Sequence, residues 1–363
     1  MNILYFSIAS GLDTAGPNIS IPASIAAQST LDNVMWINLI NVEKESWRQY
    51  PWYHQAKEWN PLRLSQLPEP FSKPDLIVFE EVYSLKYATL AREARRSCIP
   101  YIIVPRGCMT RQAFNNKSKW KKVIAHPIIF DRFIKKALAI QFLSDQERTN
   151  TRKMLNPESF VIPNGINIPE VVKNTYLTNG IRGVFIGRID IYQKGLDCLL
   201  EAINNIQNEL REKDFSLSIY GPDNNDAKKL NDIIAQHGIG DFVFLKGAVV
   251  GSEKRKILLD SDIFFLTSRS EGVPMGLLEA LSYGLPAFVT TGTGQRSNIE
   301  KYDAGWGCDF DVLDISNTLR TMSKESASIR QKGIAAVTLA KEFDWHQLAI
   351  KFHKELETRL NVK

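Results

Sequence analysis

The sequence predicts an α/β protein built from two doubly wound domains. Short apolar runs alternate with amphipathic helical patterns along the chain, which is typical of βαβ units and mainly parallel sheets. This series restarts after Gly165, and 363 residues suit two domains of roughly 100–200 residues each. No window approaches 18 consecutive apolar residues, so no transmembrane helix is expected.

The first half contains β-rich runs that end in loops rich in Gly, Pro, Ser and Asp. Strands are expected at Asn2–Ile8, Val34–Ile40, Asp75–Phe79, Tyr101–Val104, Leu138–Leu143 and Phe160–Ile162, and helices at Ile19–Gln28 and Leu85–Arg96. The aromatic-rich segment Asn41–Lys73 gives no clear pattern.

The second half repeats the alternation of strand and helix. Strands are expected at Arg182–Ile186, Phe215–Tyr220, Phe242–Leu245, Ile263–Leu266 and Ala287–Thr290, and helices at Gly195–Arg211, Asp226–His237, Ser252–Asp260 and Pro274–Tyr283, before a mostly helical tail from about Ser316. The domains are therefore placed at 1–165 and 181–343, with a linker at 166–180 and a C-terminal helix at 344–363.

Charge is unevenly distributed between the two halves. Residues 1–165 carry 21 Lys and Arg against 14 Asp and Glu, and the segment from Arg106 to Lys136 holds nine basic residues and a single acid. Such a run is either a solvated helical face or a surface for an anionic partner, such as membrane headgroups, a lipid-linked diphosphate or nucleic acid. The four cysteines are far apart, which argues against a disulfide framework or a zinc site and fits a reducing cytoplasm.

Two cations follow the first strand of the second domain. Arg188 ends the strand and Lys194 precedes the next helix. In open α/β sheets ligands bind outside the carboxyl ends of the strands. Two cations there suit a diphosphate leaving group, whose charge grows as its bond to a sugar breaks. The alternative is a pair of surface cations without a ligand.

A glycine-rich loop and helix start follow the strand Ile263–Leu266. Gly272 permits close approach of a ligand to the backbone, and Pro274 suits the first turn of a helix. The amides of Met275, Gly276 and Leu277 are then expected to point out of the helix N-terminus as a seat for an anion.

Two glutamates flank this helix start. Glu271 precedes it, and Glu279 lies less than two turns inside it, in an otherwise apolar stretch. One carboxylate can hold sugar hydroxyls and the other the cis-diol of a ribose. The alternative is that Glu279 is an ordinary helix residue paired with a lysine. A buried, unpaired carboxylate would be costly, and this weakens the alternative of a merely structural glutamate.

Taken together, these motifs resemble the retaining glycosyltransferases of family 4, the "glycosyl transferases group 1", which have the GT-B fold. The resemblance rests on Val161–Ile166, Ile186–Ile189, Lys194–Asp197, Gly221-Pro222, Glu271–Pro286 and Asp344-Trp345. It covers nearly the whole chain and is most specific in the second half. It implies two Rossmann-like domains that face each other across a cleft, with the C-terminal helix crossing back to the N-terminal domain.

The resemblance also implies roles for residues of the second domain. Arg188 and Lys194 would bind the donor diphosphate, Glu271 the donor sugar, and Glu279 the ribose. Further donor contacts are implied for Gly187, Gly221, the backbone around Lys246 to Val249, and the loop and helix start formed by Gly272, Val273, Pro274, Met275, Gly276 and Leu277. The family needs no metal ion or other cofactor, since protein cations take the place of Mg²⁺.

The first domain is expected to bind the acceptor. By the resemblance, Gly16 in the first loop would touch the donor phosphates. Arg106, in a Pro-Arg-Gly-x-Met motif similar to that of enzymes building bacterial exopolysaccharide, capsule or O-antigen, would contact acceptor or phosphate. Glu81 and His126 are weaker acceptor candidates. A structural role is the alternative for Arg106 and His126.

The expected function is retaining transfer of a sugar from a UDP-sugar to a lipid-linked glycan in bacterial surface polysaccharide biosynthesis. The basic run then favours peripheral attachment to the cytoplasmic face of an anionic membrane over a plainly soluble protein, and no nucleic-acid partner is expected. The alternatives are a GT-B UDP-sugar epimerase and a non-catalytic nucleotide-binding protein. An NAD-dependent dehydrogenase is disfavoured, because no Gly-x-Gly-x-x-Gly follows the first strand.

Overall fold

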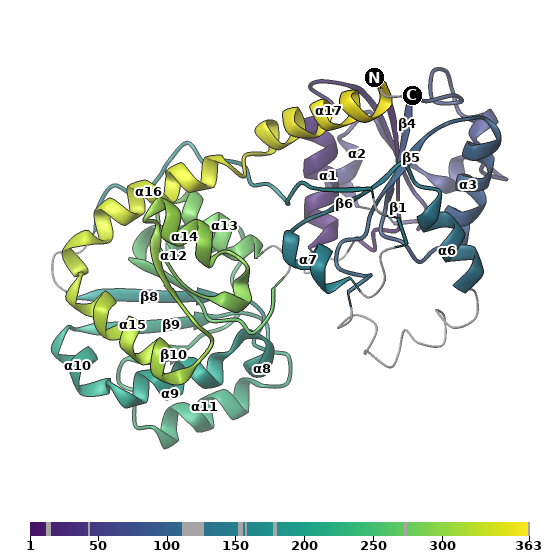
Figure 1. Cartoon of the computed structure of the whole chain (residues 1–363). Helices are drawn as coiled ribbons and strands as arrows, with labels where there is room; N and C mark the ends of the chain where they lie inside the picture. Colours follow the sequence, from purple (N-terminus) through teal and green to yellow (C-terminus); the bar gives the residue numbers. More distant parts are fainter. Residues whose placement is uncertain are drawn as a thin grey trace. The chain divides into compact units, whose positions relative to one another are not determined.

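The chain folds into two compact units, shown in Figure 1. Unit 1 comprises Met1–Gly165 and Trp345–Lys363, and unit 2 comprises Ile166–Asp344. The computed structural model describes residues 1–11, 16–42, 44–110, 127–151, 155–156, 158–176, 180–271 and 274–361.

Unit 1 is built on a seven-stranded parallel sheet with the order β3-β2-β1-β4-β5-β6-β7. Its strands are β1 (Asn2–Ser7), β2 (Asn33–Asn38), β3 (Tyr53–Gln55), β4 (Leu76–Glu80), β5 (Tyr101–Val104), β6 (Ala139–Phe142) and β7 (Ser159–Val161). The order reverses between β1 and β4, as in a doubly wound fold. The central strands are fully buried, which is typical of a parallel sheet covered on both faces.

Helices cover both faces of this sheet. They are α1 (Pro17–Gln28), α2 (Glu45–Arg48), α3 (Leu85–Arg96), α6 (Pro127–Lys135), α7 (Asp145–Asn150) and α17 (Trp345–Asn361), with short 3₁₀ turns η1 (Ala56–Glu58) and η2 (Leu64–Gln66). The last helix of the chain, α17, packs on α1 and shares one hydrophobic cluster with it, through Ile25, Leu348 and Phe352. The C-terminal helix therefore belongs to the N-terminal unit.

Unit 2 is built on a six-stranded parallel sheet with the order β10-β9-β8-β11-β12-β13. Its strands are β8 (Ile181–Ile186), β9 (Phe215–Tyr220), β10 (Val243–Leu245), β11 (Ile263–Leu266), β12 (Ala287–Thr290) and β13 (Gly305–Cys308). Its helices are α8 (Ile191–Lys194), α9 (Leu196–Asn205), α10 (Gln207–Glu212), α11 (Ala227–Gln236), α12 (Gly251–Asp260), α13 (Met275–Ser282), α14 (Arg296–Tyr302), α15 (Val312–Lys324) and α16 (Ile329–Lys341), with 3₁₀ turns η3 (Thr291–Thr293) and η4 (Ser326–Ser328). The prediction of two doubly wound α/β domains is confirmed.

The segment 166–180, expected to be a linker, groups with unit 2 in its described part. The Ile166 N–H donates to the Phe343 carbonyl at 2.7 Å. Lys173 is buried, and its Nζ donates to the Ser261 carbonyl at 2.6 Å and lies 3.2 Å from Asp262 Oδ1. The first contact attaches the segment to the chain after α16 and the Lys173 contacts attach it to the start of β11, and a polar composition alone does not predict them.

The structure differs from the sequence prediction in several elements, and the helices α2, α7 and α14 were not predicted. The edge strands β3 and β13 were not predicted, and the helix expected at 195–211 is interrupted at Ile206, where φ is −128°. In β13, Gly305 pairs with Ala287, and a Cβ on Gly305 would lie 1.9 Å from the Ala287 carbonyl oxygen. Glycine is thus required in a strand whose composition has low β propensity.

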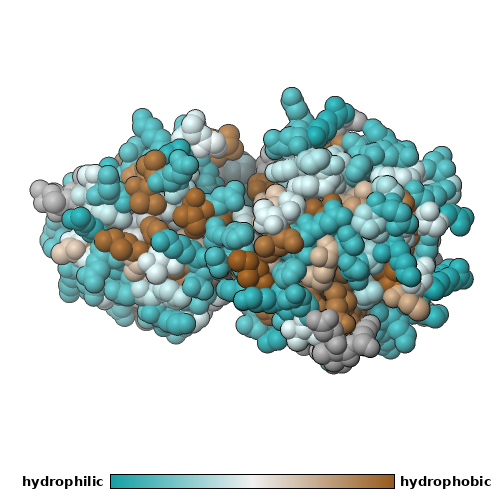
Figure 2. All heavy atoms as spheres, turned by 90° about the horizontal axis from the view of Figure 1, so that it is seen from above, coloured by the Kyte–Doolittle hydropathy of each residue, from teal (hydrophilic) through white to brown (hydrophobic). Residues whose placement is uncertain are grey.

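The surface is mainly hydrophilic, with small apolar patches on each unit in the face shown in Figure 2. Exposed large apolar side chains include Tyr192, Val250 and Leu313. Within the described residues, every helix is too short or too polar to cross a bilayer.

Candidate functional site

The loops after β8, β9 and β10 are joined at the carboxyl edge of the unit 2 sheet. The Gly187 N–H donates to the Tyr220 carbonyl at 2.9 Å, and the Gly221 N–H donates to the Gly247 carbonyl at 3.2 Å. A Cβ on Gly221 would lie 1.7 Å from the Gly187 carbonyl oxygen, so a side chain at Gly221 would force the two loops apart. The predicted residues Gly187 and Gly221 therefore meet at the edge where ligands of such sheets bind.

Lys194 and Glu271 form an ion pair on the same rim. Lys194 ends α8, Glu271 follows β11, and Lys194 Nζ donates to Glu271 Oε1 at 2.6 Å. The side chains are 14% and 10% exposed. The chain turns at Gly195 with φ 64°, and a Cβ there would lie 2.1 Å from the Thr267 carbonyl oxygen. Two predicted residues that are 77 positions apart are thus in direct contact.

Ser268 and Arg269 hold this loop in place, and sequence reasoning missed both. Ser268 Oγ donates to Glu271 Oε1 at 2.6 Å. The Arg269 guanidinium donates two hydrogen bonds of 2.8 Å to the Asp197 carboxylate and stacks on the Tyr192 ring. The hydrogen bonds to Asp197 raise the pKa of Arg269, so the cation persists. The sequence signal is weak, because only the position after a buried strand marks these two residues.

The start of α13 differs in one respect from the prediction. The Leu277 N–H donates to the Pro274 carbonyl at 3.0 Å, so the expectation of an unbonded amide at Leu277 is wrong. The reason is a tight turn at the N-cap. Met275 and Gly276 are the first two residues of α13, where a helix provides no internal partner for the amides. A Cβ on Gly276 would lie 3.1 Å from the Ile186 carbonyl oxygen, so α13 begins close to the end of β8.

Glu279 is paired with a lysine, which the sequence analysis gave as the structural alternative. Lys254 Nζ on α12 donates to Glu279 Oε2. The glutamate side chain is 30% exposed and that of the lysine 23%. The carboxylate is therefore neither buried nor unpaired, and the structural alternative carries no cost of an unpaired buried charge. A role in ribose binding stays a prediction.

The remaining predicted residues of unit 2 lie on or near the rim. Arg188 is half exposed, with Nη2 2.6 Å from Gln193 Oε1 and 3.6 Å from Asp190 Oδ2. Lys246, after β10, is exposed, and Val249 is half-buried. Arg188 thus has accessible donors on the edge that carries Lys194.

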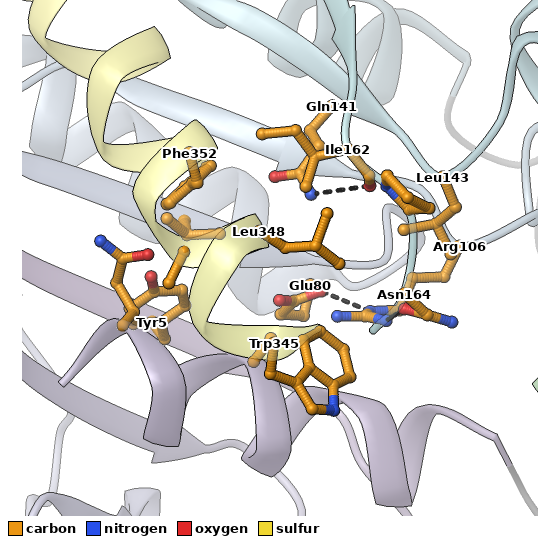
Figure 3. A pocket seen from close by; sticks show the side chains of 15 residues that line it. Tyr5, Glu80, Arg106, Gln141, Leu143, Ile162, Asn164, Trp345, Leu348 and Phe352 are labelled. Atoms are coloured by element: carbon orange, nitrogen blue, oxygen red, sulfur yellow. Dashed lines mark hydrogen bonds and ion pairs between the residues drawn. The ribbon is translucent and has the colours of Figure 1, made fainter. Parts of the chain in front are cut away.

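Arg106 of unit 1 is buried in a small cavity beneath α17, shown in Figure 3. Its Nε donates to Glu80 Oε2 at 2.6 Å, and its Nη1 donates to Ser20 Oγ at 2.9 Å and to Asn164 Oδ1 at 3.0 Å. The side chains of Arg106 and Glu80 are 5% and 3% exposed. Figure 3 shows the guanidinium directed at Glu80 and Asn164, beside Trp345. Arg106, which follows β5, therefore links Glu80 of β4 to Asn164, near the point where the chain leaves unit 1. Its contact with acceptor or phosphate stays a prediction.

Gly16 and Glu81 lie at the carboxyl edge of the unit 1 sheet. Gly16 precedes α1, and its carbonyl accepts from the Ser20 N–H at 2.9 Å. Glu81 follows β4 with φ 71°, is half-buried, and donates its N–H to the Val104 carbonyl at 2.8 Å. Both positions are on the edge where ligands of such sheets bind, and the predicted contacts of Gly16 and Glu81 stay predictions.

Several predicted residues lie outside the described ranges. These are Gly272, Val273, His126 and the lysines at 117, 119, 121 and 122. Of the described basic side chains in the same run, Arg132, Lys135 and Lys136 are exposed on or just after α6. Among the described residues, no group of three or more His, Cys, Asp or Glu side chains is placed to hold a metal ion.

Two doubly wound units, each with a parallel sheet and with candidate ligand-binding loops at the carboxyl edge of that sheet, are typical of the GT-B fold of glycosyltransferases. The structure of Anabaena Alr3699/HepE in complex with UDP aligns with a TM-score of 0.75 and 15% identity, covering 99% of this chain and all of that chain. The apo lipopolysaccharide outer core galactosyltransferase WaaB aligns with a TM-score of 0.70 and 16% identity, over 99% of this chain and all of that chain. Likeness at this level of identity establishes the fold.

Residues 175–334, which lie within unit 2, match the family model "Glycosyl transferases group 1". The chain is 29% identical over 151 residues to a component of the human phosphatidylinositol N-acetylglucosaminyltransferase, covering 40% of this chain and 30% of that protein. It is 26% identical over 145 residues to the putative colanic acid biosynthesis glycosyltransferase WcaL of Escherichia coli K12, covering 38% of this chain and 34% of that protein. The chain thus spans about a third of the length of these relatives.

Proposed function

We propose that the protein transfers a sugar from a UDP-sugar to a glycan acceptor, with retention of anomeric configuration, in bacterial surface polysaccharide biosynthesis. The observation that carries this proposal is the Lys194–Glu271 pair at the carboxyl edge of a group 1 glycosyltransferase domain. The relative named for colanic acid biosynthesis supports the pathway class, and the UDP complex of a protein with the same fold supports the nucleotide.

In this proposal Lys194 binds the donor diphosphate and stabilises the charge that grows on it as the glycosidic bond breaks. Glu271 orients the Lys194 ammonium, and Ser268 in turn orients the Glu271 carboxylate, before the donor binds. A cation that is already oriented needs no reorganisation during the reaction, which is the main source of electrostatic catalysis. Arg188 adds a second, more exposed cation on the same rim.

The proposed reaction needs no metal ion, because protein cations neutralise the diphosphate. It also needs no protein nucleophile, since retention by front-face attack relies on the leaving phosphate to accept the acceptor's proton. In this scheme Glu271 binds sugar hydroxyls. Glu279 binds the ribose hydroxyls and either keeps or gives up its ion pair with Lys254.

We further propose a lipid-linked acceptor and peripheral attachment to the cytoplasmic face of an anionic membrane. The basic run that ends at Lys136 supports this, since each cation near an anionic surface contributes about 1 kcal/mol; Arg106, which is buried against Glu80, is not one of these cations. Cosedimentation with anionic and neutral vesicles tests the attachment. Wild-type protein should pellet with anionic vesicles at low salt, and a protein that stays in the supernatant with both would contradict this part.

The activity itself is tested by incubating the full chain with UDP-, GDP- and ADP-sugars, with excess EDTA and with Mg²⁺. We expect UDP-sugar turnover, by hydrolysis or by transfer to an added glycan, at equal rates under both conditions. Loss of turnover on chelation, restored by Mn²⁺, would contradict metal independence. Interconversion of the donor sugar without release of UDP would instead favour the epimerase.

A further inference from the structure

A second hollow lies in unit 1, in the aromatic segment that gave no pattern at the level of sequence. It has a volume of about 460 Å³ and opens between the loop after β2, the turn η1 and the first turns of α3. That volume is within the roughly 300–1,000 Å³ of small-molecule sites. Its walls include none of the residues of the Arg106 cavity.

One wall of the hollow is an aromatic ring in a fixed position. The Trp59 backbone N–H donates to the Ala56 carbonyl at 3.2 Å, and the Trp59 indole meets the His54 ring edge-on, with centroids 5.5 Å apart. Trp59 and Leu62 pack against the core of the unit. The ring is therefore held in place before any ligand arrives, and its ordering adds little entropy cost to binding.

The rim of the hollow is polar. Asn41 and Asn60 are exposed, and neither amide makes a hydrogen bond to another described residue. Thr89 adds a hydroxyl from α3. Lys86 Nζ donates to the Leu39 carbonyl at 3.2 Å, and since an ammonium has three donors, two remain for a ligand. The described lining contains lysine but no carboxylate.

An aromatic wall with amides and an ammonium around it matches the two sides of a pyranose. The C–H face of a sugar packs on an aromatic face, and its hydroxyl edge exchanges hydrogen bonds with amides. A purely apolar ligand would use only the aromatic side of the hollow and would make no hydrogen bond to the exposed rim donors. The excess of positive charge favours a sugar that carries a carboxylate over a neutral one.

We propose that this hollow binds one sugar unit of a glycan, stacked on Trp59, and prefers an acidic sugar through Lys86. The assignment of that sugar to the acceptor rests on the proposed function, because a glycosyltransferase must hold its acceptor glycan. The hollow is at the carboxyl edge of the unit 1 strands, since it adjoins the loop after β2 and the start of α3, which follows β4.

The test is saturation-transfer NMR on the full chain with methyl β-D-glucuronide and methyl β-D-glucoside at millimolar concentrations. Wild-type protein should bind both and prefer the glucuronide. Trp59→Ala should reduce binding of both at least tenfold, and Trp59→Phe should retain most of it. Lys86→Gln should abolish the preference and leave glucoside binding within about twofold, since one charge-assisted contact is lost.

Two further variants separate a binding role from a structural one. Thr89→Tyr, on an exposed position of α3, should fill the hollow and block both sugars without disturbing the core. Arg63→Gln, exposed and outside the lining, should bind as the wild type does. Absence of sugar binding to the wild type, or unchanged binding to both Trp59→Ala and Thr89→Tyr, would overturn the proposal.

UDP affinity should be unchanged in all of these variants. UDP-sugar turnover without binding of either glycoside therefore refutes only this site, and binding without turnover refutes only the proposed function.

Discussion

At the scale of single residues, the Lys194 ammonium is the group on which the proposed chemistry depends most. It is 14% exposed and is held by Glu271. Lys194→Ala should lower the turnover number on the order of 10²-fold or more, because it removes a charge-assisted contact that strengthens as the leaving group gains charge. Initial rates with a UDP-sugar give the measurement.

The matched control for this prediction is Lys229→Ala, on the exposed surface of α11. This substitution removes the same charge and the same side-chain atoms as Lys194→Ala, but at a position away from the rim, so turnover should be unchanged. Circular dichroism and thermal melts verify that both variants are folded. If Lys194→Ala is folded and as active as the wild type, Lys194 is an ordinary surface cation.

The two glutamates of the rim are expected to act on different parts of the donor. Glu279→Ala should weaken the binding of free UDP by roughly 10–150-fold, since a hydrogen bond to a charged group contributes about 1.5–3 kcal/mol. Glu271→Ala should leave UDP affinity nearly intact and lower transfer. Isothermal titration calorimetry with UDP on both variants measures the difference.

The ion pair between Glu279 and Lys254 adds a necessary control. Lys254→Ala frees the carboxylate but leaves it in place, so UDP affinity should change far less than in Glu279→Ala. A loss of equal size in the two variants would mean that the pair acts only by shaping the rim. Equal UDP affinity in Glu271→Ala and Glu279→Ala would show that their roles are wrongly assigned.

A functional residue could be predicted from the sequence when it lies in a recognisable local motif, and not when only its partners in the fold reveal its role. Lys194 and Glu271 occur in recognisable local motifs, and the structure brings them together. Arg269 and Lys254 become meaningful only through contacts with residues on other elements, Asp197 and Glu279. Ser268 contacts Glu271, three residues further on, but no sequence pattern distinguishes this serine from any other polar loop residue. Leu277 shows the opposite error, because a helix start predicts open amides but not the tight turn at Pro274.

At the scale of elements, the close approach of the loops after β8 and β9 determines the shape of the rim. Gly221→Ala would place a Cβ 1.7 Å from the Gly187 carbonyl oxygen. The loops must separate, so we expect a loss of about 1–3 kcal/mol in unfolding free energy, as for overpacking, together with weaker UDP binding. Urea denaturation measures the first effect and calorimetry the second.

Gly247 provides a matched glycine control for this element. It lies in the next loop and accepts the Gly221 N–H, but a Cβ on Gly247 would have no heavy atom within 4 Å. Gly247→Ala should therefore change the unfolding free energy by no more than about 0.5 kcal/mol. Equal stability of the two variants would show that the rim tolerates separation of its loops.

Elements with strong local signals were predicted closely, and those defined by tertiary contacts were not. The helix Leu85–Arg96 and the strand Phe215–Tyr220 have the predicted bounds. The strand β3 has three residues, and Tyr53 within it packs on Trp36 with centroids 4.7 Å apart. That contact forms only once the sheet exists, and an aromatic cluster in the sequence does not reveal it.

At the scale of the whole molecule, one ionic cluster secures the chain where it enters unit 2. Asp262, at the start of β11, accepts from Arg182 Nε at 3.0 Å and lies 3.2 Å from Lys173 Nζ in the segment 166–180. The side chains of Lys173 and Asp262 are each 2% exposed. Burial lowers the pKa of Lys173, while the charge of Asp262 opposes this shift. The cluster thus links the entry segment to β8 and β11, and neither charge is stable there without the other.

The same cluster predicts how stability depends on pH. Burial acts to raise the pKa of Asp262, but hydrogen bonds from Arg182 and the Lys173 charge outweigh it, and the net pKa lies below the ordinary 3.8. A carboxyl with a lowered pKa in the folded state stabilises the protein above its unfolded pKa, and this stabilisation is lost as the pH falls through the folded value. Protonation of Asp262 therefore destabilises unit 2 only below about pH 3.8.

Asp262→Asn should make the protein less stable at neutral pH by about 3–5 kcal/mol, because it leaves the Lys173 ammonium buried without a counter-charge. The difference from the wild type should shrink as the pH is lowered below 3.8, where the wild-type carboxyl also becomes neutral. Urea denaturation of both proteins at neutral pH and at pH values around and below this range measures it. Lys173→Met with Asp262→Asn removes both buried charges and should recover part of the loss. A difference that stays constant with pH would instead assign the effect to the shape of the side chain and not to its charge.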